Sequence, residues 1–161
     1  MNDDIDTERI MAALRLARHN LNAALLEADA IYDNQNCIAQ NLDIKSTMHS
    51  WAGDFSNAEN LILRAISIDS QNVSLNFHAA QLYFKFRQYS KAIEYFELTM
   101  NMCIDDEKEI YQQIISVHLD YCFIKVGDFD KARSVLEACD LDEKIWLHGL
   151  TTPREMLRSI A

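Results

Sequence analysis

The sequence has very little of what interrupts a helix. Proline occurs once and glycine three times among 161 residues, so the chain has few places where a helix must end. No apolar run approaches the roughly 18 consecutive residues that a membrane-spanning helix needs. Hydrophobic residues nevertheless make up 49% of the chain, which is ample for a continuous core. The composition therefore predicts a soluble all-α protein.

Clusters of basic residues are also lacking. The formal net charge is −10, which argues against nucleic acid and anionic lipid because both partners select clustered lysine and arginine. The first six residues are acidic where a secretory signal would be basic, so a cytoplasmic protein is expected, with no membrane insertion. An apolar or basic protein partner stays open.

Motifs for metal binding, redox chemistry and catalysis are absent. The four cysteines show no C-x-x-C spacing and are expected to be reduced core residues: Cys37, Cys103, Cys122 and Cys139. The sequence contains no glycine-rich phosphate loop, no Gly-x-Ser-x-Gly elbow and no paired zinc-ligand spacing. We therefore expect neither an enzyme nor a metal or cofactor site.

Apolar residues recur at helical spacing along most of the chain. The pattern predicts helices at about residues 5–18, 21–32, 38–51, 58–68, 75–86, 89–102, 105–126 and 132–139. In the tail, residues 142–147 are expected to form a short helix that ends at Gly149. Residues 152–155 then read as a capping box with proline in the first helical position. The helix that follows is expected to cover the open end of the core.

Residues 73–106 form the clearest repeat unit. Two apolar helices meet at a break too short to be anything but a tight turn, and the phrase that follows it, Tyr89-x-x-Ala92, recurs as Phe55-x-x-Ala58 and Phe129-x-x-Ala132. Phe55 and Tyr89 are 34 residues apart, the period of the tetratricopeptide repeat. The phrase Gly127-Asp128-Phe129-Asp130-Lys131-Ala132 is similar to the turn of that family almost letter for letter.

The chain thus resembles the tetratricopeptide repeat family. The resemblance implies a single domain, 1–161, with a right-handed superhelix of about four helical hairpins at residues 5–38, 39–72, 73–106 and 107–140. Residues 141–161 would form a C-terminal cap. The first repeat is the weakest because His19 stands where the turn glycine is expected.

In such an array the first helix of each repeat lines the concave side, where a partner is expected to bind. The candidate groove residues come from the third and fourth repeats and are mostly aromatic or aliphatic: Phe77, His78, Gln81, Phe84, Lys85, Val117, His118, Tyr121, Ile124 and Lys125. They favour an apolar or amphipathic peptide. Alternatively, these side chains pack against one another or against the C-terminal helix.

The same resemblance predicts what the groove does not bind. Relatives that grip the acidic tail of heat-shock chaperones use a clamp of Lys, Asn, Asn, Lys and Arg. The corresponding positions here are Arg9, Ala13, Ile44, Ser74 and His78, or, one repeat later, Asp43, Thr47, His78, Ile114 and His118. Neither set forms such a clamp, so a partner that is apolar or basic rather than acidic is expected. His78 and His118 are read as hydrogen-bonded histidines, with a pH-sensitive ligand contact as the alternative.

The function predicted from these features is non-catalytic protein binding, by an adaptor or chaperone. Size, acidity and an apolar groove are similar to those of the small chaperones of type III secretion translocators, although no residue motif singles them out. A second hypothesis is a structural subunit that docks in a larger assembly by its convex face or C-terminal helix. Homo-oligomerisation stays open.

Overall fold

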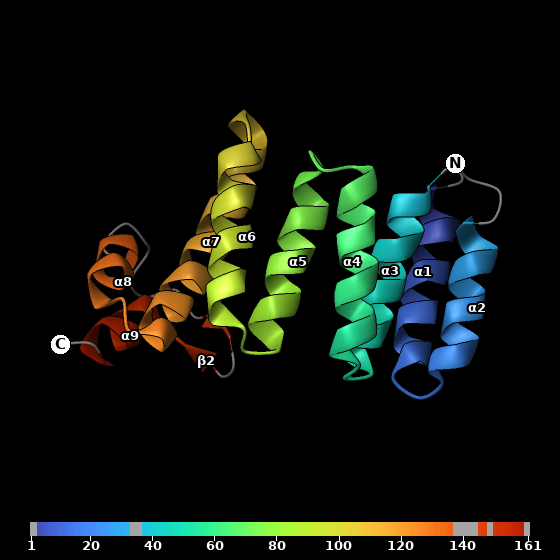
Figure 1. Ribbon diagram of the computed structural model, residues 1–161, viewed down its shortest axis with the longest axis horizontal. Helices are drawn as coiled ribbons and strands as arrows, with labels where there is room; N and C mark the ends of the chain where they lie inside the picture. The colour runs from blue at the N-terminus through green and yellow to red at the C-terminus, as the bar shows by residue number, and fades with distance from the viewer. Residues whose placement is uncertain (1–2, 33–36, 137–144, 148–149, 160–161) are drawn as a thin grey trace. The chain divides into compact units, whose positions relative to one another are not determined.

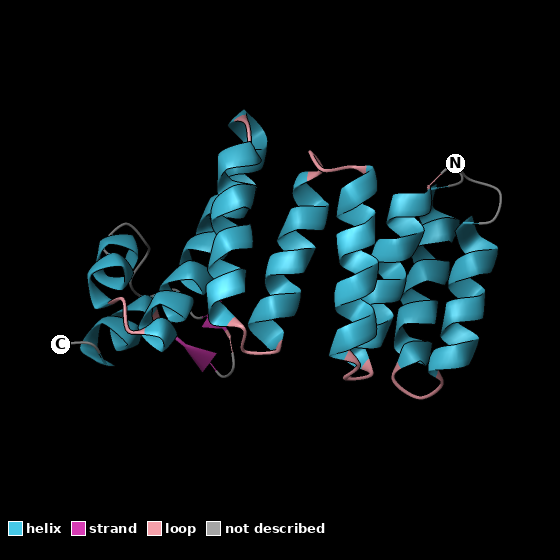
Figure 2. Cartoon of the chain, in the orientation of Figure 1, coloured by secondary structure: helices cyan, strands magenta, loops and turns pink. Residues whose placement is uncertain are grey.

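A computed structural model describes residues 3–32, 37–136, 145–147 and 150–159. The chain forms two compact units, Met1–Leu82 (unit 1) and Tyr83–Ala161 (unit 2), which are described separately. Figure 1 labels the helices and strands, and Figure 2 shows that most of the described chain is helical. Across the ranges described, no helix is both long enough and apolar enough to span a membrane.

Unit 1 consists of helical hairpins. Its helices are α1 (Asp3–Ala17), α2 (Leu21–Tyr32), α3 (Ile38–Trp51), α4 (Phe55–Ile68) and most of α5 (Val73–Lys85). α1, α2 and α3 pack around a core whose smallest members are Ala13, Ala24 and Ala28, all at most 1% exposed. Alanine at helical spacing lets neighbouring helix backbones approach closely, so the hairpins pack side by side (Figure 1).

The polar residues of α3 have specific partners. Ser46 donates a buried hydrogen bond of 2.8 Å to the carbonyl of Ala58 on α4, and the Lys45 ammonium contacts Asp29 of α2. These contacts explain why α3 lacks a regular apolar stripe: part of its packing to both neighbours is polar. Its bounds agree with the sequence prediction of residues 38–51.

Unit 2 contains the last residues of α5, then α6 (Tyr89–Met102), α7 (Asp105–Val126), α8 (Phe129–Leu136) and α9 (Pro153–Ser159). α7 packs against both α6 and α8, and its 22 residues make it two turns longer than α6, as the sequence predicts. The core includes Phe96, Ile115 and Leu136, all fully buried.

Three of the helix-to-helix turns share one backbone geometry. In each, a residue with positive φ follows the first helix: Gly53 (φ 83°), Arg87 (φ 61°) and Gly127 (φ 83°). The amide of the next residue then donates to a carbonyl five residues back, at 2.9 Å in every case: Asp54 to His49, Gln88 to Tyr83 and Asp128 to Phe123. The turn after α1 differs, because Asn20 instead bonds four residues back to Leu16. The turn that differs is the one that contains His19, where the sequence predicts a poor match to the repeat.

The C-terminal segment is partly different from the prediction. Ile145–Trp146 (β1) and Leu150–Thr151 (β2) form a two-residue antiparallel ladder, so the expected helix at 142–147 is wrong at its end, and its residues 142–144 lie outside the described part. Ladder bonds to β2 satisfy backbone groups that a short isolated helix would leave unpaired. The capping box is confirmed: the Glu155 amide donates to Thr152 Oγ1 (3.2 Å) and the Thr152 amide to Glu155 Oε2 (3.0 Å).

Candidate partner-binding groove

The predicted groove residues lie on α5 and α7 and are divided between the two units. Phe77, His78 and Gln81 belong to unit 1; the remaining seven belong to unit 2, namely Phe84, Lys85, Val117, His118, Tyr121, Ile124 and Lys125. Each half of the set is therefore considered within its own unit.

In unit 1, the half-buried His78 of α5 pairs with Asp43 of α3. Its Nδ1 lies 2.8 Å from Oδ2 and 2.9 Å from Oδ1 of the carboxylate, whose side chain is 12% exposed. The hydrogen bond that His78 donates to the Asp43 carboxylate raises the pKa of His78, whereas burial lowers it. Phe77 is buried and Gln81 exposed, so His78 and Gln81 are the accessible members of this half.

In unit 2, the groove residues form an aromatic cluster with two further rings. Phe84 lies edge-on to His118 and Tyr121, with ring centroids 4.8 and 5.5 Å apart. Tyr89 of α6 reaches the same Tyr121 ring at 6.0 Å, and Phe96 lies 5.3 Å from His118. Edge-on aromatic pairs stabilise such a cluster beyond the area they bury. The cluster joins the end of α5 to α6 and α7.

The candidate groove residues of unit 2 differ in exposure. Phe84 and Val117 are buried, whereas His118, Tyr121 and Ile124 are half-buried, and these three are called the wall below. The exposed Lys125 places its ammonium 4.9 Å from the centre of the Tyr121 ring. A ligand at this wall would contact aromatic and aliphatic faces beside a cation, which suits an amphipathic peptide.

Both His78 and His118 make hydrogen bonds within the protein, as expected for hydrogen-bonded histidines. His118 Nδ1 lies 2.7 Å from the Ile114 carbonyl one turn back on α7, so this nitrogen donates. His78 bonds Asp43. Within the ranges that the structure describes, no group of three or more His, Cys, Asp or Glu side chains is placed to hold a metal ion.

Two contributors were not among the predicted groove residues. Asp43 is 35 residues from His78 in sequence, and nothing local indicates their pairing. Tyr89 was identified as the recurrent aromatic of the repeat, and that position on the second helix was the available signal for a packing role. Its pKa is raised, first by burial and then by Tyr121 beside it.

α7 also carries two buried titratable groups. Asp120 is 0% exposed and neither carboxylate oxygen has a hydrogen-bond partner, and burial raises its pKa to about 7. Burial, with Asp120 nearby, raises the pKa of the Cys122 thiol to about 12. Such a thiol stays protonated at neutral pH and is a poor nucleophile. The described cysteines, Cys37, Cys103 and Cys122, are free thiols.

Comparison with known proteins identifies the repeat. Residues 73–98, which include α5 and the first part of α6, match the sequence model of the family described as tetratricopeptide repeat. The chain carries a tetratricopeptide repeat. The matched residues lie within the repeat predicted at 73–106, and they include the candidate groove residues of α5. No curated protein matches the sequence.

Solved structures share the fold of this tetratricopeptide-repeat chain. A crystal structure of MamA aligns with a TM-score of 0.60 and 15% identity over 80% of this chain and 74% of that one. A second crystal structure of MamA protein gives 0.59 and 15% over 83% and 73%. The predicted all-α helical repeat fold is therefore confirmed. At such identity the likeness concerns the fold alone.

Proposed function

We propose that the chain is a non-catalytic adaptor or chaperone that binds an apolar or amphipathic segment of a partner protein along the first helices of its repeats. The tetratricopeptide-type repeat is in general a scaffold for protein interaction. The observation that carries the proposal is the half-buried wall of His118, Tyr121 and Ile124 on α7. Accessible apolar and aromatic side chains on the first helix of a repeat are what a peptide groove requires.

The chemistry of the wall restricts the ligand. Rings at T-shaped contact distances leave edges and faces for an aliphatic or aromatic side chain, while a cation stands at the border of the wall. Within unit 1, Gln81 and the imidazole of His78 would offer hydrogen bonds to a segment bound at that unit. Apolar anchors with a few polar contacts define the proposed partner class.

The second candidate is a structural subunit that docks by the second helices of the repeats. Exposed apolar residues on those helices favour it: Leu63 on α4 is 37% exposed, Leu98 on α6 44% and Phe129 on α8 49%. A partner that covers them would bury this surface permanently. The two candidates use different helices, so they can be separated by where a partner makes contact.

Site-specific photo-cross-linking makes this separation. The photoreactive amino acid benzoylphenylalanine would replace Tyr121 on α7 in one variant and Leu98 on α6 in a matched second, followed by irradiation in native extract and identification of adducts. The groove proposal expects a discrete adduct from position 121 alone. Adducts from position 98 alone would reject the groove and support the structural subunit, and an adduct with the chain itself would identify a homo-oligomer.

The captured partner then permits a quantitative test. Tyr121→Ala removes an aromatic wall residue and is expected to weaken binding about tenfold or more, as for central aromatic residues of interfaces. Leu98→Ala is the control and should leave affinity unchanged. Circular dichroism would verify that both variants remain folded, and equal affinity of a folded Tyr121→Ala variant would reject the role of the wall.

A further inference from the structure

One of the three equivalent turns has opposite charge chemistry. Two of them read Gly53-Asp54 and Gly127-Asp128, whereas the turn between α5 and α6 reads Arg87-Gln88 with the same hydrogen bonds. Arg87 holds φ at 61°, a conformation that costs a residue with a Cβ atom about 1 kcal/mol or more. Glycine would avoid this strain, and aspartate at the next position would cap α6. The turn between α5 and α6 therefore lacks both the glycine and the aspartate, and it carries the cation of Arg87 instead.

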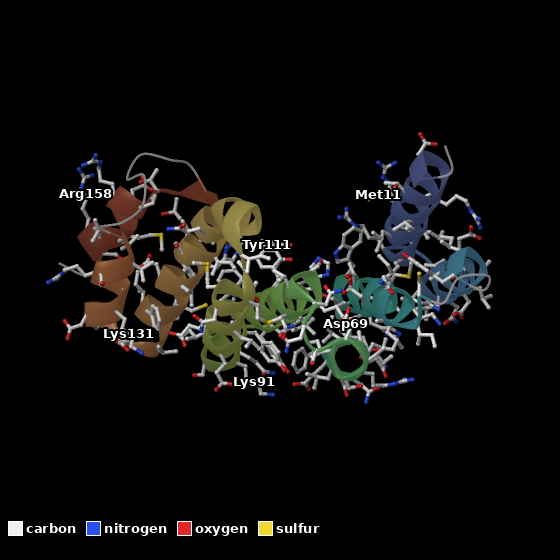
Figure 3. The ribbon with its side chains drawn as sticks, turned by 90° about the horizontal axis from the view of Figure 1, so that it is seen from above. Met11, Asp69, Lys91, Tyr111, Lys131 and Arg158 are labelled. Atoms are coloured by element: carbon white, nitrogen blue, oxygen red, sulfur yellow. The ribbon has the colours of Figure 1, made fainter. Side chains whose placement is uncertain are left out.

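Further cations surround this turn. A depression of about 330 Å³ opens beside it, lined by Arg87, Gln88, Tyr89, Ser90, Lys91 and Val126. Lys91 is exposed and points away from α6 (Figure 3), with its ammonium 4.9 Å from the Tyr83 ring. Val126 at the end of α7 completes the lining, and its neighbour Lys125 has its ammonium 4.9 Å from the centre of the Tyr121 ring.

The chain contains 25 acidic residues, but the lining of the depression includes none of them. The sequence has no Asp or Glu between Asp69 and Glu94, a stretch that includes all of α5, the turn and the start of α6. On α7, the only acid between Glu109 and Asp128 is Asp120, which is fully buried. The charged residues that line the depression, Arg87 and Lys91, are therefore both basic in a protein of net charge −10.

We propose that the segment bound by unit 2 is acidic as well as apolar: it places a carboxylate-bearing side chain at Arg87 and Lys91 and its apolar side chains on Tyr121 and Ile124 of the wall. This inference rests on the proposed function and deepens it. Charge complementarity decides the occupant, because a basic segment would meet the cations of Arg87 and Lys91 in the lining of the depression, whereas an acidic one would be attracted to them. The proposal departs from the expectation of an apolar or basic partner, which rested on the net charge and on the missing carboxylate clamp.

The test uses the full chain and two labelled hexapeptides, Phe-Glu-Leu-Phe-Glu-Leu and its counterpart with Gln in place of Glu. Affinities would be measured by fluorescence polarisation at low and high salt. We expect the acidic peptide to bind about five- to tenfold more tightly at low salt, as for a few exposed charge pairs, and the preference to fall as salt screens the charges.

The decisive variant is Arg87→Gly combined with Gln88→Asp, because it installs the chemistry that the other two turns already use and should fold. It is expected to abolish the preference for Glu over Gln while keeping affinity for the neutral peptide. The control Arg64→Gln removes an exposed cation from α4 in unit 1 and should change nothing.

Each other outcome overturns a separate statement. Equal affinity of the wild type for both peptides, or no binding of the acidic peptide, rejects the acidic partner but leaves the groove proposal, which is judged by cross-linking at position 121. A preference retained by the double variant also rejects the assigned cations. Salt-sensitive dimerisation that the double variant abolishes would make a second copy of the chain the occupant, against the proposal.

Discussion

The carboxylate of Asp120 should make the stability of unit 2 depend on pH. It is fully buried on α7 without a hydrogen-bond partner, and burial raises its pKa from the ordinary value of 3.8 to about 7. An ionised carboxylate in such a place has lost its hydration without gaining donors, so the protonated form is favoured in the folded state. In the unfolded chain the same group ionises at its ordinary pKa.

The sign and size of the effect follow from these two values. Between about pH 4 and about pH 7 the folded chain holds a proton that the unfolded chain has released, so stability falls as pH rises through this range. A difference of about three pKa units corresponds to about 4 kcal/mol. This contribution is fully present at low pH and is lost above about pH 7.

The substitution Asp120→Asn tests this reasoning because the amide has the same size and no charge. We expect the variant and the wild type to have similar free energies of unfolding near pH 4, and the variant to become more stable by up to about 4 kcal/mol near pH 8. Urea unfolding would be followed by tryptophan fluorescence in a Trp51→Phe background. Trp146 in β1 is then the remaining tryptophan and belongs to unit 2.

The control is Glu97→Gln, which removes an exposed carboxylate from α6 and should shift stability by no more than about 0.5 kcal/mol at any pH. If Asp120→Asn destabilises unit 2 more at neutral pH than at low pH, the carboxylate is ionised and partnered in the folded state. The reasoning from its burial would then be refuted.

Three further substitutions test the turns, the interhelical contacts and the histidine pair. Gly127→Ala should lower the free energy of unfolding by about 1 kcal/mol in urea, because φ of 83° disfavours a Cβ atom although the space around it is open; an unchanged value would contradict the strain. Ser46→Ala should lower the free energy of unfolding by about 1–3 kcal/mol, since the Ala58 carbonyl loses its buried donor. The control is Ser67→Ala, which changes an exposed serine on α4. The pKa of His78 is raised by Asp43, so the stability lost in His78→Asn should be largest below about pH 6 and shrink as pH rises through the raised pKa. A loss that is constant from about pH 5 to about pH 9 would contradict this pairing.

The sequence by itself determined the helical repeat, because the signals involved are local. The bounds of α6 agree with the apolar periodicity, and the box of Thr152 and Glu155 forms as its spacing predicts. Apolar period, cap and turn chemistry act within a few residues, so they can be read without knowing the neighbours in space. The same signals predicted a repeat at 73–106, and residues 73–98 within it match the family model.

The tertiary structure decided which of the groove residues remain accessible and what they contact. Helical spacing placed Phe84, Val117 and Tyr121 on candidate faces, but only packing buried the first two and left the third half-exposed. The same applies to His78, whose partner Asp43 lies 35 residues away, and to β1, where a two-residue ladder with β2 replaces an expected helix. Such outcomes depend on contacts between segments distant in sequence, which periodicity along one helix does not specify.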